Sequence, residues 1–290
     1  MNRFTDKSRK TDFFIGAGVL VATLVILIAG IVFTIRKEER RRQEIFMAAA
    51  TAETTAAPVE PTYPPPEENP YGPEDFQYDG RYLTSLAGDS VVGIDVSEFQ
   101  GEIDWQQVRD SGVEFVMIRA GFRGYGNGSM HEDEMARTYY AGAKEAGLKV
   151  GAYFFSQATN EYEARQEAVM AMEITEGWEL DLPIMFDWEY INEEARTAEV
   201  TREQLTRYSY AFCKELQKAG RQGGVYFNQI QGSDMLYLSL LEEFPFWLAM
   251  YSDRMTYPYK VDMWQYTSEG EVPGISGGVD INLYFPEGSG

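Results

Sequence analysis

Two acidic residues, Asp187 and Glu189, follow the apolar run Leu182–Phe186 and are separated by a single tryptophan. Because side chains two positions apart in an extended strand share a face, both carboxyl groups point in one direction. Their backbone anchors are then about 6.5 to 7 Å apart, so the carboxyls can flank one scissile bond, as hydrolysis of a glycosidic bond requires. The other interpretation is a pair of solvated acids that end a strand. The buried-strand pattern favours catalysis, since barrel enzymes place catalytic side chains at the C-terminal ends of such strands.

Two further strand-like runs carry acids that can join this pair. Asp95 lies in the run Gly93–Ser97, and Asp280 lies in the run Gly277–Asn282. If these runs are the first and last strands of a closed barrel, they are neighbours, and their acids lie side by side across the barrel mouth from the first pair. Clustered carboxylates raise one another's pKa, which allows one of them to remain protonated as a general acid near neutral pH.

Apolar runs of strand length alternate with helical segments, which predicts βα units and a parallel sheet. The expected strands are Val91–Val96, Phe115–Ala120, Lys149–Phe155, Leu182–Glu189, Gly223–Asn228 and Phe246–Tyr251, and the expected helices are Asp104–Ser111, Asp133–Ala146, Glu161–Glu176 and Thr201–Ala219. Two last runs, Val261–Thr267 and Val279–Phe285, are separated by a loop too short for a helix, so an irregular or antiparallel closure is expected. The expected fold class is α/β, an irregular (β/α) TIM-like barrel of about eight strands with atypical C-terminal strands.

The residues before the barrel form segments of different composition. A short tail, 1–12, precedes the uncharged apolar run Phe13–Ile35, which is long enough to cross a bilayer because a spanning helix needs about 20 residues. Charged residues follow directly, in place of the small-residue cleavage site of a signal peptide, so we expect an uncleaved transmembrane helix, with a cleaved signal as the alternative. Residues 36–90 are interpreted as a juxtamembrane segment and a Pro-, Thr- and Glu-rich linker, and residues 91–287 as one catalytic barrel.

The composition excludes several chemistries. The chain has 46 acidic and 25 basic side chains and a net charge of −21 at pH 7, which disfavours nucleic acid as a partner. The same charge favours a neutral sugar face near the reacting bond over a polyanion. With one cysteine and one histidine, internal disulfides and multi-Cys or multi-His zinc sites are excluded. A Cys–His dyad is disfavoured because Cys213 lies in an apolar helical run, and we expect neither a metal nor another cofactor.

Several short motifs follow one another between Val91 and Phe285. They are Gly93–Ser97 with Gln100–Trp105, Ile118–Gly121, Gly151–Phe155, the acid pair, Trp264–Tyr266 and Val279–Asp280. In this order the set resembles the glycoside hydrolase family 25 lysozymes, the muramidases that cut peptidoglycan. The resemblance implies hydrolysis of the β-1,4 bond between N-acetylmuramic acid and N-acetylglucosamine.

The same resemblance implies a role for each acid. Glu189 would donate a proton to the leaving oxygen. Asp187 would stabilise the positive charge at the anomeric carbon, either as a covalent nucleophile or by orienting the 2-acetamido group of the substrate. Asp95 and Asp280 would bind substrate and tune the charge of the pair.

Aromatic side chains near the strand ends are candidates for sugar binding, because sugars present apolar faces that stack on rings. Matching family positions favour Tyr153, Tyr226 and Trp264 as substrate-binding residues, together with Gln265. For the other aromatics near strand ends we expect core packing, since alternation turns about half of them away from the cleft. Arg119 also ends a strand, where it pairs with a site acid or with a structural partner.

The expected function is that of a membrane-anchored peptidoglycan hydrolase that acts on glycan strands of the nearby wall. The alternatives are a tethered peptidoglycan-binding module without turnover and a hydrolase of another amino-sugar polymer. Lys and Arg residues lie on both sides of the apolar run, so charge leaves the orientation open. We expect a single-pass cell-membrane protein with an extracytoplasmic catalytic domain, an orientation inferred from the function.

Overall fold

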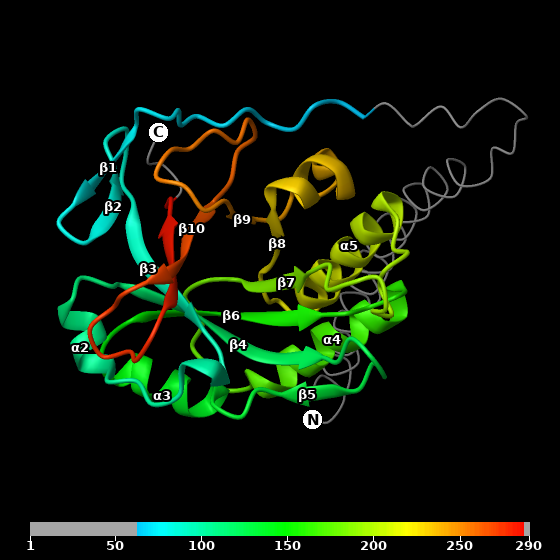
Figure 1. Ribbon diagram of the computed structural model, residues 1–290. Coiled ribbons are helices and arrows are strands. Elements are labelled where there is room, and N and C mark those ends of the chain that lie inside the picture. Colours follow the sequence, from blue (N-terminus) through cyan, green and yellow to red (C-terminus); the bar gives the residue numbers. More distant parts are fainter. Residues whose placement is uncertain (1–62, 287–290) are drawn as a thin grey trace, which may run out of the picture. The chain divides into compact units, whose positions relative to one another are not determined.

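Residues 63–286 are described by the structure, a computed structural model, and their strands form a closed barrel (Figure 1). The barrel strands are β3 (Val91–Val96), β4 (Phe115–Arg123), β6 (Lys149–Ser156), β7 (Ile184–Trp188), β8 (Gly223–Asn228), β9 (Phe246–Ala249), β10 (Met263–Gly270) and β11 (Val279–Tyr284). Their order is β3-β11-β10-β9-β8-β7-β6-β4, and pairing of β3 with β4 closes the ring. The expected barrel of about eight strands is confirmed.

The last strand closes the barrel against the direction of the others. The pairs from β3 through β4, β6, β7, β8 and β9 to β10 are parallel, whereas β11 runs antiparallel to both β10 and β3. The connection from β10 to β11 is only a short loop, and a connection of that kind joins antiparallel strands. The expected antiparallel closure is confirmed, and its register places Asp280 directly opposite Asp95.

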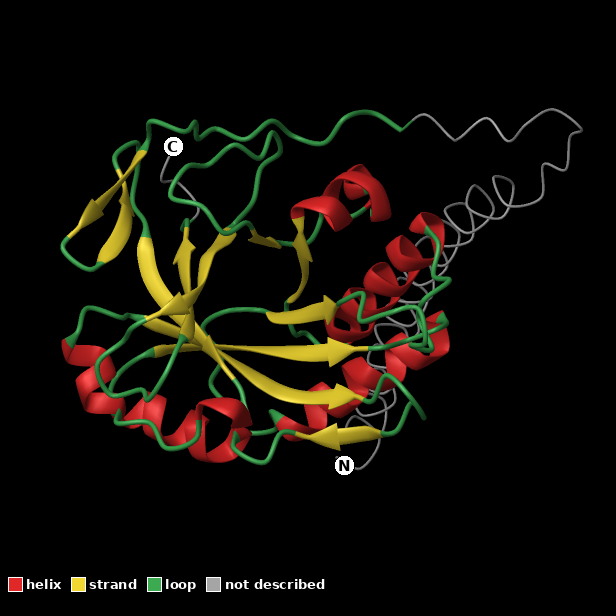
Figure 2. Cartoon of the chain, in the orientation of Figure 1, coloured by secondary structure: helices red, strands yellow, loops and turns green. Residues whose placement is uncertain are grey.

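Helices cover one side of the barrel (Figure 2). They are α2 (Trp105–Asp110), α3 (Ala136–Glu145), α4 (Glu161–Ile174) and α5 (Arg202–Lys218), each within an expected helical span. Three begin at polar residues whose side chains accept a backbone N–H of the first turn, namely Asp104, Asn160 and Thr201. After β8 the described chain forms only short helical turns, 231–235 and 238–240, so the barrel is TIM-like on one side only.

Alternation along the strands separates two apolar layers. Met185 of β7 faces the barrel interior, where it belongs to a cluster with Met117, Tyr153, Tyr226 and Trp247, among others. Its neighbours Ile184, Phe186 and Trp188 face outward into the larger core beneath the helices. Because both faces of β7 are buried, the strand reads as a continuous apolar run in the sequence.

The chain just before residue 91 contains secondary structure that the sequence did not predict. Residues 36–90 were interpreted as a juxtamembrane segment and a linker. Within the described part of this range, an antiparallel hairpin, β1 (Phe76–Asp79) and β2 (Tyr82–Ser85), packs on the barrel. Phe76 and Leu83 are buried in the outer core, and the Phe76 ring lies 5.0 Å from that of Trp264 in β10. The compact unit that contains the barrel thus extends from Val91 back to Tyr63. Pro-rich composition concealed a few apolar residues that find partners only in the folded barrel.

The expected transmembrane helix, residues 13–35, lies outside the described residues. In the range 63–286, every helix is too short or too polar to serve as a bilayer span.

Candidate functional site

Four carboxyl groups meet at the mouth of the barrel, at the C-terminal ends of its parallel strands. Asp95 lies near the end of β3, Asp187 lies near the end of β7, and Glu189 follows one residue after that strand. Asp280 reaches the same end from β11, because an antiparallel strand begins where its neighbours end. Asp187 interacts electrostatically with the other three acids, so the structure brings the four predicted side chains together.

Asp95 is held by two side-chain amides. Its Oδ2 accepts hydrogen bonds from Nε2 of Gln265 and Nδ2 of Asn282, both at 2.8 Å. Burial raises the pKa of Asp95 to about 6, although the two amide donors oppose the increase by stabilising the charged form. Asp95 is thus fixed in orientation while it remains able to exchange a proton near neutral pH.

The amides that hold Asp95 are themselves oriented by aromatic donors. The Oε1 atom of Gln265 accepts hydrogen bonds from the Tyr226 hydroxyl at 3.2 Å and the Tyr251 hydroxyl at 3.1 Å. The Oδ1 atom of Asn282 accepts one from Nε1 of Trp247 at 2.8 Å. Because indole N–H groups only donate, the Asn282 amide must turn its NH₂ group towards Asp95.

Asp187 lies in the least solvated position of the four. It is buried, and among the described residues its Oδ1 has no hydrogen-bond partner. Loss of hydration raises the pKa of Asp187 well above its usual range, and the nearby Glu189 and Asp95 raise it further. The positive charge of Arg119 lowers the pKa of Asp187 and so opposes these increases.

Glu189 and Asp280 complete the cluster. Burial raises the pKa of Glu189, and the neighbouring Tyr226 hydroxyl offsets part of the increase. Burial, followed by the charge of Asp95, raises the pKa of Asp280 to about 8. The cluster therefore retains protons at a pH where solvated carboxyls are ionised, which is the condition for general-acid catalysis near neutral pH.

The raised pKa of Asp280 predicts that this residue lowers the free energy of unfolding at high pH. Between about pH 4 and pH 8 the folded protein keeps a proton on Asp280 that the unfolded chain has lost, so the free energy of unfolding falls as pH rises. Asp280→Asn removes this loss, and we expect it to raise the melting temperature more at pH 8 than at pH 5. Thermal unfolding followed by circular dichroism at both pH values checks this. Asp253→Asn, at an exposed position, is the control, and an equal gain at the two pH values would contradict the prediction.

Three of the four predicted binding residues lie at the site. Tyr153 and Tyr226 belong to the interior cluster, and the pKa of each is raised well above its usual range by burial and then by site carboxyls. Gln265 contacts Asp95 directly. The structure therefore places these three beside the acids.

Trp264 is a correction, because it faces away from the mouth. Its side chain has no exposed surface, packs in the outer core and donates from Nε1 to the Met250 carbonyl at 2.8 Å. Adjacent residues of a strand point to opposite faces, so Gln265 and Trp264 cannot both reach the site. Trp264 instead packs on the outer face of β10, in the core outside the barrel.

Arg119 has structural partners. Its guanidinium pairs with Glu98 at 2.9 Å and with Asp133 at 2.7 Å, and it lies over the rings of Phe99 and Phe122. The side chain acts on Asp187 only through its field. Of the two roles open from the sequence, the structure selects the structural ion pair.

Sequence reasoning missed two residues that contact the site. Asn282 donates to Asp95, and Tyr251 donates to Gln265. A signal for Asn282 was present, because it lies two positions after Asp280 and so shares its face of the strand. Tyr251 was assigned to core packing, but it lies past the end of β9 and its side chain is 60% exposed.

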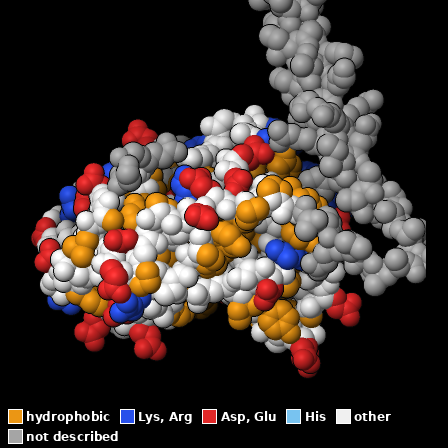
Figure 3. Space-filling view, turned by 90° about the horizontal axis from the view of Figure 1, so that it is seen from above, with side chains coloured by type: hydrophobic (Ala, Val, Ile, Leu, Met, Phe, Trp, Pro, Cys, Tyr) orange, Lys and Arg blue, Asp and Glu red, His pale blue; other side chains and the backbone are white. Residues whose placement is uncertain are grey.

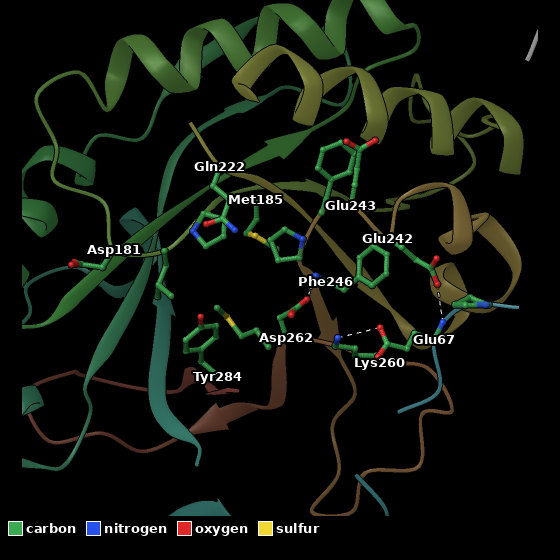
Figure 4. Close-up of a pocket in the computed structure, with 16 residues that line it drawn as sticks. Glu67, Asp181, Met185, Gln222, Glu242, Glu243, Phe246, Lys260, Asp262 and Tyr284 are labelled. Carbon is green, nitrogen blue, oxygen red and sulfur yellow. Dashed lines mark hydrogen bonds and ion pairs between the residues drawn. The ribbon is translucent and has the colours of Figure 1, made fainter. Parts of the chain in front are cut away.

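A separate cavity of about 390 Å³ lies at the other end of the barrel (Figure 4). Its lining includes Leu182 and Gln222, which precede β7 and β8, and Tyr284, which ends β11. The four acids of the mouth are absent from this lining. Within residues 63–286, no group of three or more His, Cys, Asp or Glu side chains is arranged to hold a metal ion.

Comparison with known proteins agrees with this arrangement. A family model described as glycosyl hydrolases family 25 matches residues 94–275. The autolytic lysozyme of Clostridium acetobutylicum is 30% identical over 199 residues, which are 68% of this chain and 56% of that protein. Lysozyme M1 of Streptomyces globisporus is 28% identical over 232 residues, which are 76% of this chain and 72% of that protein.

Solved structures of similar fold include two bacterial enzymes. The modular autolysin LytC of Streptococcus pneumoniae matches with a TM-score of 0.59 at 27% identity, over 68% of this chain and 47% of that one. LytC has also been solved with a synthetic peptidoglycan ligand. The lysozyme of Streptomyces coelicolor matches with a TM-score of 0.56 at 26% identity, over 68% of this chain and 93% of that one. The chain thus spans about half the length of the autolytic lysozyme and of LytC. The family model covers more than half of the chain, and the chain therefore belongs to family 25 of the glycosyl hydrolases.

Proposed function

We propose that this protein is an N-acetylmuramidase that cleaves the β-1,4 bond between N-acetylmuramic acid and N-acetylglucosamine in peptidoglycan. The observation that carries the proposal is the cluster of four carboxyls at the barrel mouth, in which burial raises the pKa of each. Such a cluster supplies both a proton donor and a negative charge, the two requirements of glycoside hydrolysis. Family membership and the peptidoglycan ligand of LytC support the choice of substrate.

Glu189 is the proposed proton donor and Asp187 the proposed charge stabiliser. Glu189 lies just beyond the strand end and is partly exposed, so a bridging oxygen in the mouth can reach it. Asp187 is more deeply buried, and its Oδ1 has no hydrogen-bond partner within residues 63–286. It acts either as a nucleophile or by orienting the substrate's 2-acetamido group. Asp95 and Asp280 bind substrate and set the charge of the pair.

The test of this function is product analysis. The full-length protein is incubated with one defined peptidoglycan preparation, and mass spectrometry identifies the new reducing termini. New N-acetylmuramic acid termini support the proposal, whereas new N-acetylglucosamine termini refute it. Binding without new termini would indicate a glycan-binding module, and cleavage of chitin oligomers alone would indicate another amino-sugar polymer.

Exposed aromatic side chains lie beyond the strand ends that form the mouth. Phe99 is 78% exposed after β3, Tyr125 is 56% exposed after β4, Tyr190 is 52% exposed after β7, and Tyr251 is 60% exposed after β9. Exposed rings are surfaces on which apolar sugar faces stack. On the face shown in Figure 3, acidic side chains and some Lys and Arg are spread among hydrophobic and uncharged ones. The net charge of −21 suits a neutral glycan better than a polyanion.

Replacement of Phe99 is expected to weaken substrate binding. Phe99 lies in a three-residue turn held by two hydrogen bonds, from Ser97 N to Gln100 Oε1 and from Glu98 N to Asp133 Oδ2, and Arg119 lies 5.0 Å from its ring. A preorganised ring loses little entropy when it stacks on a sugar. Phe99→Ala should raise KM by about 2- to 10-fold with little change in kcat, the range expected for one aromatic contact.

The measurement is the initial rate of reducing-end release over a range of glycan concentrations. Tyr78→Ala is the control, because Tyr78 is an exposed tyrosine of β1 that precedes the family-matched residues. An unchanged KM in Phe99→Ala, or an equal increase in the control, would remove Phe99 from the binding surface.

We further propose that residues 13–35 form a single-pass membrane anchor and that the barrel acts outside the cytoplasm, in remodelling of the nearby wall. The uncharged apolar run and the location of peptidoglycan support this topology. Protease added to intact cells should degrade the barrel, whereas a barrel that stays protected until lysis would overturn the topology. Release of the processed protein into the medium would instead indicate a cleaved signal.

A further inference from the structure

Glu189 follows β7 directly, at a point where the pairing of β7 with both neighbouring strands has ended. On one side, β7 pairs with β6 up to Trp188 opposite Ser156. On the other, β7 pairs with β8 up to Asp187 opposite Tyr226. Glu189 is therefore beyond the last backbone pair on both sides, where a residue ordinarily gains conformational freedom.

Gln157 holds the peptide group that follows Glu189. It comes directly after β6 and is wholly buried. Its Nε2 donates to the Glu189 carbonyl at 2.8 Å and to the Ser156 carbonyl at 2.9 Å, and its Oε1 accepts from the Thr197 hydroxyl at 2.8 Å. Because both carbonyls can only accept hydrogen bonds, the Gln157 amide has only one possible orientation, with its NH₂ group towards them.

Gln231 holds the peptide group that precedes Glu189. It lies in the turn after β8, is 4% exposed, and donates from Nε2 to the Trp188 carbonyl at 2.8 Å. Its Oε1 accepts from Asn228 N at 2.8 Å, and its own N–H donates to Asn228 Oδ1 at 2.9 Å. This reciprocal pair fixes the side chain from the β8 side, opposite to Gln157.

We infer that Gln157 and Gln231 are positioning residues, which fix the two peptide planes flanking Glu189 and so aim its carboxyl into the mouth. A residue whose adjoining peptide groups are both held has a fixed backbone conformation and a fixed Cα–Cβ direction. One residue beyond the sheet, hydrogen bonds from the two side-chain amides take the place of the backbone hydrogen bonds between strands. They keep Glu189 on the same face as Asp187. The inference rests on the proposed role of Glu189 as proton donor.

Loss of either hydrogen bond should affect catalysis more than binding. A general acid works only within hydrogen-bond reach of the oxygen that it protonates, and a displacement of about 1 Å can lower a rate by about 10²-fold. The hydrogen bonds of these glutamines do not reach Gln265, Asp95 or the exposed rings, which are the proposed substrate contacts. A purely structural role would instead lower the melting temperature and leave kcat of the folded protein unchanged.

The experiment uses the full-length protein with Gln157→Met and Gln231→Met, singly and together. We expect kcat for reducing-end release to fall by about 10- to 100-fold in each, with KM within about twofold of the original. Thr175→Val is the matched control, because the buried Thr175 hydroxyl donates to the Ala171 carbonyl at 2.8 Å in the helix layer. It should lower the melting temperature without changing kcat. If the methionine variants fail to fold, Thr197→Val removes only the hydroxyl that orients Gln157 and should lower kcat by a smaller factor.

A second readout is independent of turnover. Glutamate labelled with ¹³C at its carboxyl carbon reports the titration of Glu189, whose signal is assigned by its loss in Glu189→Gln. Burial raises this pKa, so release of the backbone towards solvent should shift the pKa down towards the ordinary value for glutamate. If the variants show this downward shift but the original protein releases no reducing ends, the positioning role is preserved and the proposed function is refuted. An unchanged titration together with an unchanged kcat would overturn the positioning role.

Discussion

Replacing Glu189 by glutamine is expected to reduce the release of new reducing ends by about 10²- to 10⁴-fold, the range of a positioned general acid. Glutamine has nearly the same shape but has no acidic proton to transfer to the bridging oxygen. Glutamine is uncharged, as a protonated general acid is, and burial favours the neutral form of Glu189 by raising its pKa. The fold and the affinity for glycan should therefore be retained.

The measurement combines reducing-end release with sedimentation on insoluble peptidoglycan, which reports binding. Glu193→Gln is the matched control, because Glu193 is an exposed acid in the loop that follows. Full activity in Glu189→Gln would show that another carboxyl donates the proton. Loss of both binding and folding would show that the residue has a structural role.

Replacing Phe76 by alanine is expected to lower the free energy of unfolding by about 3 to 5 kcal/mol, as for other large aromatic side chains removed from a core. Phe76 is 8% exposed, and its ring lies 5.7 Å from that of Tyr71, 5.0 Å from that of Trp264 and 6.0 Å from that of Phe285. Its loss leaves a cavity between the hairpin and the closing strands. Urea unfolding, followed by tryptophan fluorescence, measures the change.

Tyr78→Ala is the control for this prediction, because Tyr78 lies in the same strand but is 56% exposed. It should change the free energy of unfolding by no more than about 0.5 kcal/mol. Equal effects of the two substitutions would mean that the hairpin does not contribute to the core. A chain that starts at Val91 lacks the whole hairpin and should be far less stable than one that starts at Tyr63.

The hairpin also connects stability with the site. It packs on β10 through Trp264, whose neighbour Gln265 holds Asp95. Among the described elements, it lies on the side of the barrel away from α3, α4 and α5 (Figure 1). Removing the hairpin therefore exposes the outer faces of β10 and β11, whose inner faces carry Gln265, Asn282 and Asp280. We expect activity to decline together with stability in hairpin variants, in contrast to the kcat effect of the Gln157 and Gln231 variants in a folded protein.

Local patterns in the sequence were sufficient for the barrel strands, the four helices and the acids. Continuous apolar runs identified the parallel strands because both of their faces are buried, and each of these strands overlaps its predicted range. Asp187 and Glu189 were placed on one face by strand geometry alone. The juxtaposition of Asp95 with Asp280 also followed from the sequence, because closure of a barrel makes its first and last strands neighbours.

The face that each strand turns inward was decided only by the tertiary structure. Alternation along a strand requires Trp264 and Gln265 to point to opposite faces, but it does not say which of them reaches the mouth. That is decided by the residues that each side chain contacts: Phe76 of the hairpin packs on Trp264, and Asp95 accepts a hydrogen bond from Gln265. The same holds for Gln157 and Gln231, which lie 32 and 42 positions from Glu189 in opposite directions along the chain and meet it only because β6 and β8 flank β7. Periodicity is a local property of the chain, whereas burial and hydrogen bonding depend on segments that become neighbours only when the barrel closes.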